Sequence, residues 1–204
     1  MTGMTRAERL DALRPEVLAC QSCGLRRTAR QVVFGEGHPE ARVVFIGEGP
    51  GAQEDAAGRP FVGAAGQLLD KMLAAMNLSR SRDVYILNVV KCRPPGNRAP
   101  EKEEQVQCRP HLDRQVAILD PVIVVLLGST AVRALIQDDA RITRVRGKWV
   151  SRDGRWWMPT YHPAALLRNP ELKRHVWSDL KRVLDKYREL VDPGHQTPHY
   201  PIRQ

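Results

Sequence analysis

Four cysteines are the residues of this 204-residue sequence that point most clearly to a bound inorganic group. Cys20 and Cys23 form a C-x2-C pair, and Cys92 and Cys108 follow much later as a C-x15-C pair. The first residues, MTGMTRAERL, lack the apolar stretch of a secretory signal, which favours a reducing compartment and therefore ligands over disulfides. Zinc and a 4Fe–4S cluster both accept four thiolates, and the spacing alone does not choose between them. Unrelated buried cysteines are the third interpretation.

Four polar residues each follow the last apolar residue of a predicted strand, and each could bind a ligand or take part in chemistry. They are Glu48, Asn88, Ser129 and His162. In open α/β sheets ligands bind at the carboxyl ends of the strands, so we expect these side chains to converge on one cleft. Simpler roles exist for three of them: Asn88 as a turn cap, His162 as a turn residue before proline, and Ser129 as a helix cap, which is the favoured interpretation for Ser129.

Residues 47–66 contain six glycines, more than a strand-to-helix turn needs. Glycines let a backbone approach a ligand closely and expose its N–H groups, so this loop is expected to line a binding site. No Gly-Lys-Ser/Thr follows, which excludes a Walker phosphate loop. Ala52 stands where a dinucleotide fingerprint has its third glycine, although some variants accept alanine there. Phe61 lies between these glycines, which favours a pocket wall over the core.

The elements that would position these residues alternate along the chain. Apolar runs at 42–46, 84–87 and 121–127 are typical of buried strands, and apolar residues recur at helical spacing over 64–77 and 171–190. This alternation predicts an α/β protein with three layers: a central, mainly parallel four-stranded sheet with helices on both faces.

Beyond these elements, we expect a basic hairpin at 141–158. A single domain should span 1–191, followed by a flexible, proline-rich tail over 192–204. No run of 18 apolar residues occurs, so a membrane span is not expected. Because the first residues lack a secretory signal, we expect a cytoplasmic location.

The net charge of +9 comes almost wholly from the C-terminal part of the chain. Residues 141–204 hold 14 Lys/Arg and 6 Asp/Glu, whereas residues 1–140 hold 18 and 17. A basic region on a nearly neutral body favours a polyanionic partner such as nucleic acid.

Taken together, these residues resemble the family 4 uracil-DNA glycosylases, the iron–sulfur branch of the uracil-DNA glycosylase superfamily. The resemblance runs from about Cys20 to Leu190. It rests on the four cysteines and on Gly47-Glu48-Gly49-Pro50-Gly51 with Glu54-Asp55, Gly58-Arg59-Pro60-Phe61-Val62-Gly63, Asn88-Val89-Val90-Lys91-Cys92-Arg93-Pro94-Pro95, and His162-Pro163 with Leu166-Leu167-Arg168-Asn169-Pro170. A sister group that traps DNA covalently carries an arginine-rich insert after the asparagine strand. Here Pro94-Pro95-Gly96-Asn97-Arg98 stand in that place, so the chain departs from that group.

The resemblance implies a 4Fe–4S cluster held by Cys20, Cys23, Cys92 and Cys108. It also implies hydrolysis of the N-glycosidic bond of flipped-out deoxyuridine in single- or double-stranded DNA, which releases uracil and leaves an abasic site for base excision repair. The protein would act as a monomer in the cytoplasm, associated with the nucleoid through its DNA.

The resemblance further assigns catalytic roles to Glu48, Asn88 and His162. Glu48 would hold or activate the attacking water, or stabilise the cationic sugar, and these roles are left open. The Asn88 amide would accept from uracil N3–H and donate to O4, which tells uracil from cytosine. His162 would donate to O2, where negative charge grows as the bond breaks.

Other residues would bind the base and the DNA. Phe61 would stack on uracil, and Gly49 and Glu54 would complete the pocket, with Glu54 shaping it against the methyl group of thymine. Leu167 and Arg168 would form the wedge that fills the gap left by the flipped nucleotide. A place for Leu167 in the core ahead of the last helix is the alternative.

Two other functions compete with a glycosylase. A non-catalytic, zinc-bearing nucleic-acid binder would also use four cysteines and a basic surface. A cluster-containing oxidoreductase is the second competitor, but no dinucleotide fingerprint or substrate-facing redox motif supports it.

Overall fold

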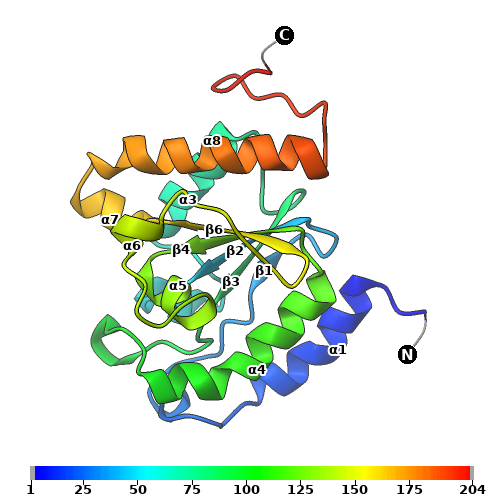
Figure 1. Ribbon diagram of the computed structural model, residues 1–204. Helices are drawn as coiled ribbons and strands as arrows, with labels where there is room; N and C mark the ends of the chain where they lie inside the picture. The colour runs from blue at the N-terminus through cyan, green and yellow to red at the C-terminus, as the bar shows by residue number, and fades with distance from the viewer. Residues whose placement is uncertain (1–2, 203–204) are drawn as a thin grey trace.

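A six-stranded sheet lies at the centre of the computed structural model, which describes residues 3–202 (Figure 1). The strand order is β1-β3-β2-β4-β6-β5. The strands are β1 (Glu36–Gly37), β2 (Val43–Gly47), β3 (Val84–Asn88), β4 (Ile123–Leu127), β5 (Val150–Arg152) and β6 (Arg155–Thr160).

The four inner strands, β3, β2, β4 and β6, run parallel, and the two edge strands run antiparallel to their neighbours. The predicted α/β class with a mainly parallel sheet is therefore confirmed, and the sheet has two strands more than the four expected. β1 contains only two residues, too few to produce an alternating pattern in the sequence. β5 and β6 form a hairpin later than the predicted 141–158, because Ile142–Val145 is the short helix α6.

Helices cover both faces of the sheet (Figure 1). The helices on one face are α1 (Arg6–Leu18), α4 (Lys102–Leu119) and α5 (Ser129–Leu135), and those on the other are α3 (Ala64–Ala75), α7 (Pro163–Arg168) and α8 (Leu172–Leu190). The remaining elements are α2 (Ala52–Ala57) and the 3₁₀ turns η1 (Gly24–Arg27) and η2 (Pro95–Asn97). Within residues 3–202, no helix is long and apolar enough to cross a membrane.

The wholly apolar strands are explained by this burial on both faces. Along β2, Val44 and Ile46 pack into the cluster beneath α1 and α4, whereas Val43 and Phe45 pack into the cluster beneath α3 and α8. Successive side chains of a strand point to opposite faces, so a strand with helices on both sides needs apolar residues at every position.

The carboxyl ends of the parallel strands meet at one edge of the sheet. Gly47 pairs with Asn88, and Leu127 pairs with Thr160. The loops that follow β2, β3, β4 and β6 therefore leave the sheet side by side, as the sequence predicts for Glu48, Asn88, Ser129 and His162.

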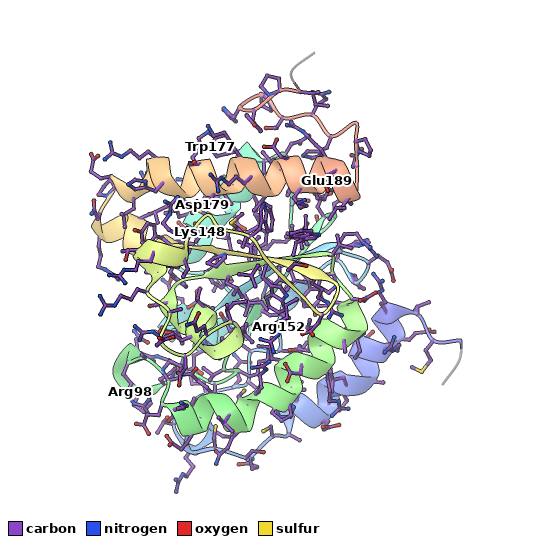
Figure 2. All side chains as sticks on the ribbon, in the orientation of Figure 1. Arg98, Lys148, Arg152, Trp177, Asp179 and Glu189 are labelled. Carbon is purple, nitrogen blue, oxygen red and sulfur yellow. The ribbon has the colours of Figure 1, made fainter. Side chains whose placement is uncertain are left out.

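A buried carboxylate, Asp179, attaches α8 to the end of β6, and it lies on the side of α8 that faces the sheet (Figure 2). The hydroxyl of Thr160 donates to Asp179 Oδ2 at 2.6 Å, and Arg146 Nε donates to the same oxygen at 3.0 Å. Gly147 passes so close, at φ +71°, that a Cβ there would lie 2.4 Å from Asp179 Oδ1. Because His162 lies two residues after Thr160, this contact helps to fix the strand end that carries the imidazole.

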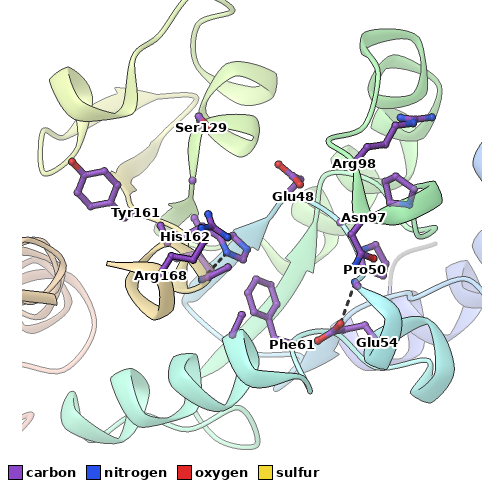
Figure 3. A pocket seen from close by; sticks show the side chains of 18 of the residues that line it. Glu48, Pro50, Glu54, Phe61, Asn97, Arg98, Ser129, Tyr161, His162 and Arg168 are labelled. Atoms are coloured by element: carbon purple, nitrogen blue, oxygen red, sulfur yellow. Dashed lines mark hydrogen bonds between the residues drawn. The ribbon is translucent and has the colours of Figure 1, made fainter. Parts of the chain in front are cut away.

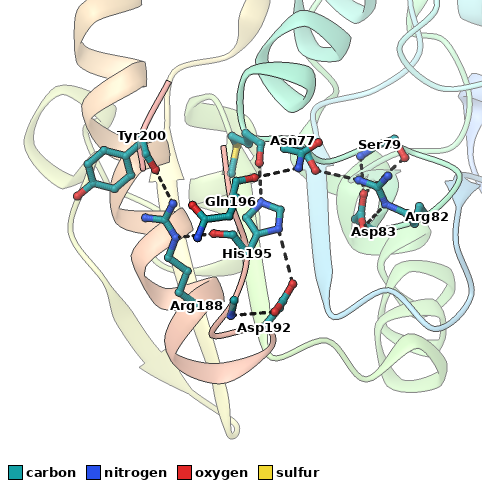
Figure 4. Close-up of polar contacts among 11 residues, drawn as sticks. Asn77, Ser79, Arg82, Asp83, Arg188, Asp192, His195, Gln196 and Tyr200 are labelled. Atoms are coloured by element: carbon teal, nitrogen blue, oxygen red, sulfur yellow. Dashed lines mark hydrogen bonds and ion pairs between the residues drawn. The ribbon is translucent and has the colours of Figure 1, made fainter. Parts of the chain in front are cut away.

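Residues 192–202, predicted from composition to belong to a flexible tail, lie against the ends of α3 and α8 (Figure 4). His195 Nε2 lies 2.7 Å from the carbonyl oxygen of Met76, and the Thr197 hydroxyl donates to the carbonyl of Ala75 at 2.7 Å. Both side chains are buried. They satisfy carbonyl groups at the C-terminal end of α3 that the helix itself leaves free.

Removing these two contacts should destabilise the protein. In a His195→Ala/Thr197→Val variant, each lost hydrogen bond costs about 1 kcal/mol. A chain of this size loses roughly 2–4 °C of melting temperature per kcal/mol, so we expect a fall of roughly 4–8 °C by calorimetry. Gln196→Ala, an exposed side chain between the two, is the matched control. Equal melting temperatures for both variants would show that the tail is not anchored.

Candidate active site

A cavity of about 490 Å³ opens at the carboxyl edge of the sheet (Figure 3). It is built from the loops after β2, β3, β4 and β6, from helix α7, and from one residue each of α3 and α6. The predicted site residues among those that line it are Glu48, Gly49, Glu54, Phe61, Ser129, His162 and Arg168. The structure therefore brings together residues that are separated by more than one hundred positions in the sequence.

The ring of Phe61 forms one wall of this cavity and stacks against the imidazole of His162. The ring centroids are 5.4 Å apart and the planes differ by 28°. The backbone of Phe61 has φ +53°, a left-handed conformation that a residue with a bulky side chain rarely adopts. Gly66 makes this conformation possible, because a Cβ at residue 66 would lie 1.8 Å from the carbonyl oxygen of Phe61.

Asn88, at the end of β3, lies directly beside Phe61. A Cβ on Gly47 would lie 2.5 Å from Phe61 Cζ and 2.7 Å from Asn88 Oδ1, so both groups occupy the space next to that glycine. Asn88 is only 2% exposed, and both its Nδ2 and its Oδ1 are buried without a hydrogen-bond partner among the described residues. A buried unpaired polar group costs about 1–3 kcal/mol, so an amide with both functions open is an arrangement suited to a ligand.

His162 caps the N-terminus of α7, and this cap fixes its tautomer. Its Nδ1 accepts a hydrogen bond from the backbone N–H of Ala164 at 3.1 Å, which leaves the ring proton on Nε2. Burial, with a smaller effect from the charge of Arg168, lowers the pKa of His162 to about 4. The imidazole is therefore neutral near physiological pH and presents an N–H donor.

Close packing also determines where the His162 ring lies. Gly128, at the end of β4, has φ +91°, and a Cβ there would lie 2.9 Å from His162 Cβ. A larger residue at 128 would therefore collide with the side chain of His162.

Glu48 is held by a residue that the sequence analysis does not single out. The hydroxyl of Thr130, in the first turn of α5, donates to Glu48 Oε2. The backbone N–H of Val90 donates to the carbonyl of Glu48 at 3.1 Å, which ties the loop after β2 to the loop after β3. The sequence predicts a role for the neighbouring Ser129, two residues after the end of β4. The position of Thr130 next to Ser129 is the only signal for Thr130 in the sequence.

Glu54 uses its carboxylate to join two segments of the glycine-rich loop. Its Oε1 accepts from the backbone N–H groups of Val62 at 2.9 Å and Gly63 at 2.8 Å, and its Oε2 accepts from that of Gly51 at 3.1 Å. The carboxylate therefore fixes the segment that follows Phe61.

Neighbouring leucines in α7 have different environments. Leu166 is buried in the core cluster beneath α8, whereas Leu167 is 49% exposed. Arg168 follows and lines the cavity. The pair predicted to contact DNA thus comprises an exposed apolar side chain and a cation at the mouth of the site.

The loop after β3 supplies lining residues that were not predicted. Asn97 and Arg98 lie at the cavity across from Arg168 (Figure 3). Arg98 donates to both carboxylate oxygens of Glu104, at 2.9 and 2.6 Å, and this contact lowers the pKa of Glu104. The basic, proline-containing composition of this loop was the feature of the sequence that could have pointed to Asn97 and Arg98.

All four cysteines line a second, small cavity, which lies between α1, α4 and the loop after β3. Cys92 and Cys108 are buried, and Cys20 and Cys23 are partly exposed. Burial raises the pKa of the Cys92 thiol to about 12, and each of the other three cysteines adds to the rise. Over residues 3–202, no group of three or more His, Cys, Asp or Glu is arranged to hold a single metal ion. The convergence of four thiols nevertheless fits the donor set of a 4Fe–4S cluster.

Fold and site define an α/β protein in which a carboxylate and an imidazole at strand ends line one pocket with the ring of Phe61. The Asn88 amide, predicted to belong to the same site, lies buried beside Phe61 and is not among the lining residues. The family model for the Uracil DNA glycosylase superfamily matches residues 34–181. The chain belongs to this superfamily and, within it, to the type-4 uracil-DNA glycosylases.

Several relatives support this placement. The type-4 uracil-DNA glycosylase of Thermotoga maritima is 45% identical over 185 residues, which cover 88% of this chain and 95% of the relative. That of Sulfurisphaera tokodaii is 43% identical over 201 residues, covering 94% and 89%. That of Archaeoglobus fulgidus is 43% identical over 185 residues, covering 86% and 92%.

The protonation state of His162 can be measured directly. We expect its ring nitrogens, followed by NMR, to show a neutral Nε2–H tautomer near neutral pH and to titrate near pH 4, because burial disfavours the cation. In the unfolded chain His162 has its ordinary pKa of 6.5, so the unfolded state binds a proton at a higher pH than the folded state does. The contribution of His162 to the free energy of unfolding is therefore complete above pH 6.5 and is lost as the pH falls to about 4. Titration near 6.5, or a proton on Nδ1, would contradict this description.

Proposed function

We propose that this protein is a uracil-DNA glycosylase that hydrolyses the N-glycosidic bond of flipped-out deoxyuridine, releasing uracil and leaving an abasic site. The observation that carries the proposal is the buried, unpaired amide of Asn88 beside the Phe61–His162 stack. It would act as a monomer in the cytoplasm on single- or double-stranded DNA, as a first step of base excision repair.

Recognition of the base would rest on Phe61 and Asn88. Uracil is planar and would stack on the Phe61 ring, with Gly49 allowing the backbone to come close. The Asn88 amide would accept from N3–H through Oδ1 and donate to O4 through Nδ2. Cytosine presents an acceptor at N3 and a donor at N4, so with the amide in this orientation it would leave both Asn88 atoms unpaired, at a cost of about 1–3 kcal/mol each.

Bond cleavage would rely on charge complementarity. As the bond between sugar C1′ and uracil N1 breaks, its electron pair moves to the base and negative charge appears on O2. The neutral His162 would donate its Nε2–H to that oxygen, a contact that typically contributes about 10²–10³ in rate. The neutral imidazole suits this role because it donates a hydrogen bond through Nε2–H to O2 and keeps the proton.

Glu48 would act on the sugar side of the bond. Anchored by Thr130, its carboxylate would orient the water that attacks C1′ and accept its proton, and its charge would stabilise the positive sugar that develops. Water therefore supplies the hydroxyl group at C1′, and uracil leaves with the bonding electrons.

Contact with DNA would use α7 and the basic C-terminal part. Flipping a nucleotide costs a few kcal/mol, and the exposed Leu167 would fill the gap that it leaves. Arg168, at the cavity mouth, would pair with a phosphate of the strand.

The four cysteines would hold a 4Fe–4S cluster. Bound there, the cluster would supply structural cross-linking, because it would join the loop after α1, helix α4 and the loop after β3. Lys91, between Asn88 and Cys92 in sequence, connects this region to the active site: its N–H donates to Cys108 Sγ at 3.3 Å and its Nζ to the carbonyl of Asn88 at 3.1 Å. A zinc-bearing, non-catalytic nucleic-acid binder is the alternative.

The cluster is tested by the colour and metal content of the purified protein. We expect a brown solution with a broad absorption at roughly 400 nm and about four irons per chain. Because the thiols lie between three segments, Cys92→Ser should lower both the absorption and the melting temperature. A colourless protein with one zinc per chain would support the zinc-bearing alternative.

A uracil-containing oligonucleotide tests the activity. Single- and double-stranded substrates should both acquire alkali-labile sites without added metal or nucleotide, and His162→Ala should slow single turnover by about 10²–10³. Arg168→Ala should weaken DNA binding more than it slows the bound complex. Cytosine- and thymine-containing strands are the controls. Intact uracil-containing strands after incubation with the wild-type protein would refute the proposal.

A further inference from the structure

We propose that Arg80 is a positioning residue for base binding: its guanidinium holds the backbone of Phe61 in the conformation that presents the ring to the base. The effect on base binding rests on the proposed function, in which Phe61 stacks on uracil. Arg80 itself lies outside the cavity lining, in the loop between α3 and β3.

Two consecutive carbonyl groups of the pocket loop point to this one side chain. Arg80 Nη1 donates to the carbonyl oxygen of Pro60 at 2.6 Å, and Nη2 donates to that of Phe61. The Arg80 side chain is only 13% exposed. The planar guanidinium matches two neighbouring acceptors at once, which the single ammonium of lysine cannot do in the same geometry.

The contact is made where the backbone is under strain. Phe61 has φ +53°, and a non-glycine residue in such a conformation persists only when its surroundings hold it there. Binding of the carbonyls on both sides of the Phe61 Cα, those of Pro60 and Phe61, fixes the peptide units that set this torsion. Without Arg80, the loop is free to return to a more common conformation.

Helix α3 provides the fixed point for this arrangement. Its residue Asp70 accepts from Arg80 Nε at 2.7 Å and so orients the guanidinium. On the same helix, the carbonyl of Phe61 packs so closely against Gly66 that no side chain could be placed at residue 66. On the other side of the loop, Glu54 binds the N–H groups of Val62 and Gly63. The carbonyls and the N–H groups of this segment are thus held from opposite sides.

The consequence concerns the ring. Phe61 meets His162 at a centroid distance of 5.4 Å and adjoins the Asn88 amide at Gly47. A displacement of the ring by about 1 Å would disturb stacking and the contacts of both neighbours, and errors of that size cost up to about 10²-fold in rate.

The experiment compares Arg80→Met with Arg82→Met. Arg82 belongs to the same loop and makes the same kinds of contact, an ion pair with Asp83 at 2.9 Å and a bond to the Asn77 carbonyl at 2.9 Å, but these do not reach Phe61 (Figure 4). Measurements are the single-turnover rate on uracil-containing DNA, inhibition by free uracil, and the NMR shift of the His162 ring proton, which senses the stacked Phe61 ring.

We expect Arg80→Met to weaken inhibition by uracil and to slow single turnover by about tenfold to a hundredfold, and to shift the His162 signal. Arg82→Met should leave all three values close to those of the wild type. Arg80→Lys should recover little, since it cannot bind both carbonyls. In a Phe61→Ala background, Arg80→Met should have almost no further effect on rate, because the residue acts through that ring.

The inference is overturned if Arg80→Met lowers only the melting temperature while uracil inhibition and the His162 shift stay at wild-type values. It is also overturned if the rate loss persists undiminished in the Phe61→Ala background. If the proposed function is wrong, the wild-type protein will release no uracil. The NMR shift of the His162 ring proton in the free protein would still report whether Arg80 positions Phe61.

Discussion

The absence of a side chain at Gly47 is the constraint on which the site depends. A Cβ there would overlap both the Phe61 ring and the Asn88 amide oxygen, so only glycine lets the two lie together at the strand end. The amide is buried there with both functions unpaired, which costs free energy in the free protein. A base that pairs with both atoms recovers that cost, whereas one with the reverse donor–acceptor pattern does not. If Asn88 has the proposed role, this cost favours one base over the other before any chemistry takes place.

Contacts around this point hold the groups that are proposed to react. Asp179 fixes the end of β6 ahead of His162, and Thr130 holds Glu48. Glu54 and Arg80 bind the loop of Phe61 from its N–H and carbonyl sides. Preorganised groups need no rearrangement when charge develops, which is why such supports matter for rate as well as for stability.

The pattern of the sequence was sufficient to predict the layers of the fold and several of the residues that line the cavity. Apolar runs required a sheet covered on both faces, and strand ends placed Glu48 and His162 at one edge. The short edge strand β1 carried no periodicity, and the packing of Thr197 against α3 depends on a contact between distant segments. Arg80 and Thr130 could not be recognised for the same reason, since each acts on a residue far away in the chain.

Side-chain NMR of Asn88 gives the most direct test of this description. The two amide protons on Nδ2 would be followed while free uracil, and separately cytosine, is added to the protein. We predict that uracil shifts both signals and slows their exchange with water, because the amide becomes fully paired, and that cytosine at the same concentration leaves them unchanged. Unchanged Asn88 signals at uracil concentrations that inhibit the enzyme would contradict the central role of this amide.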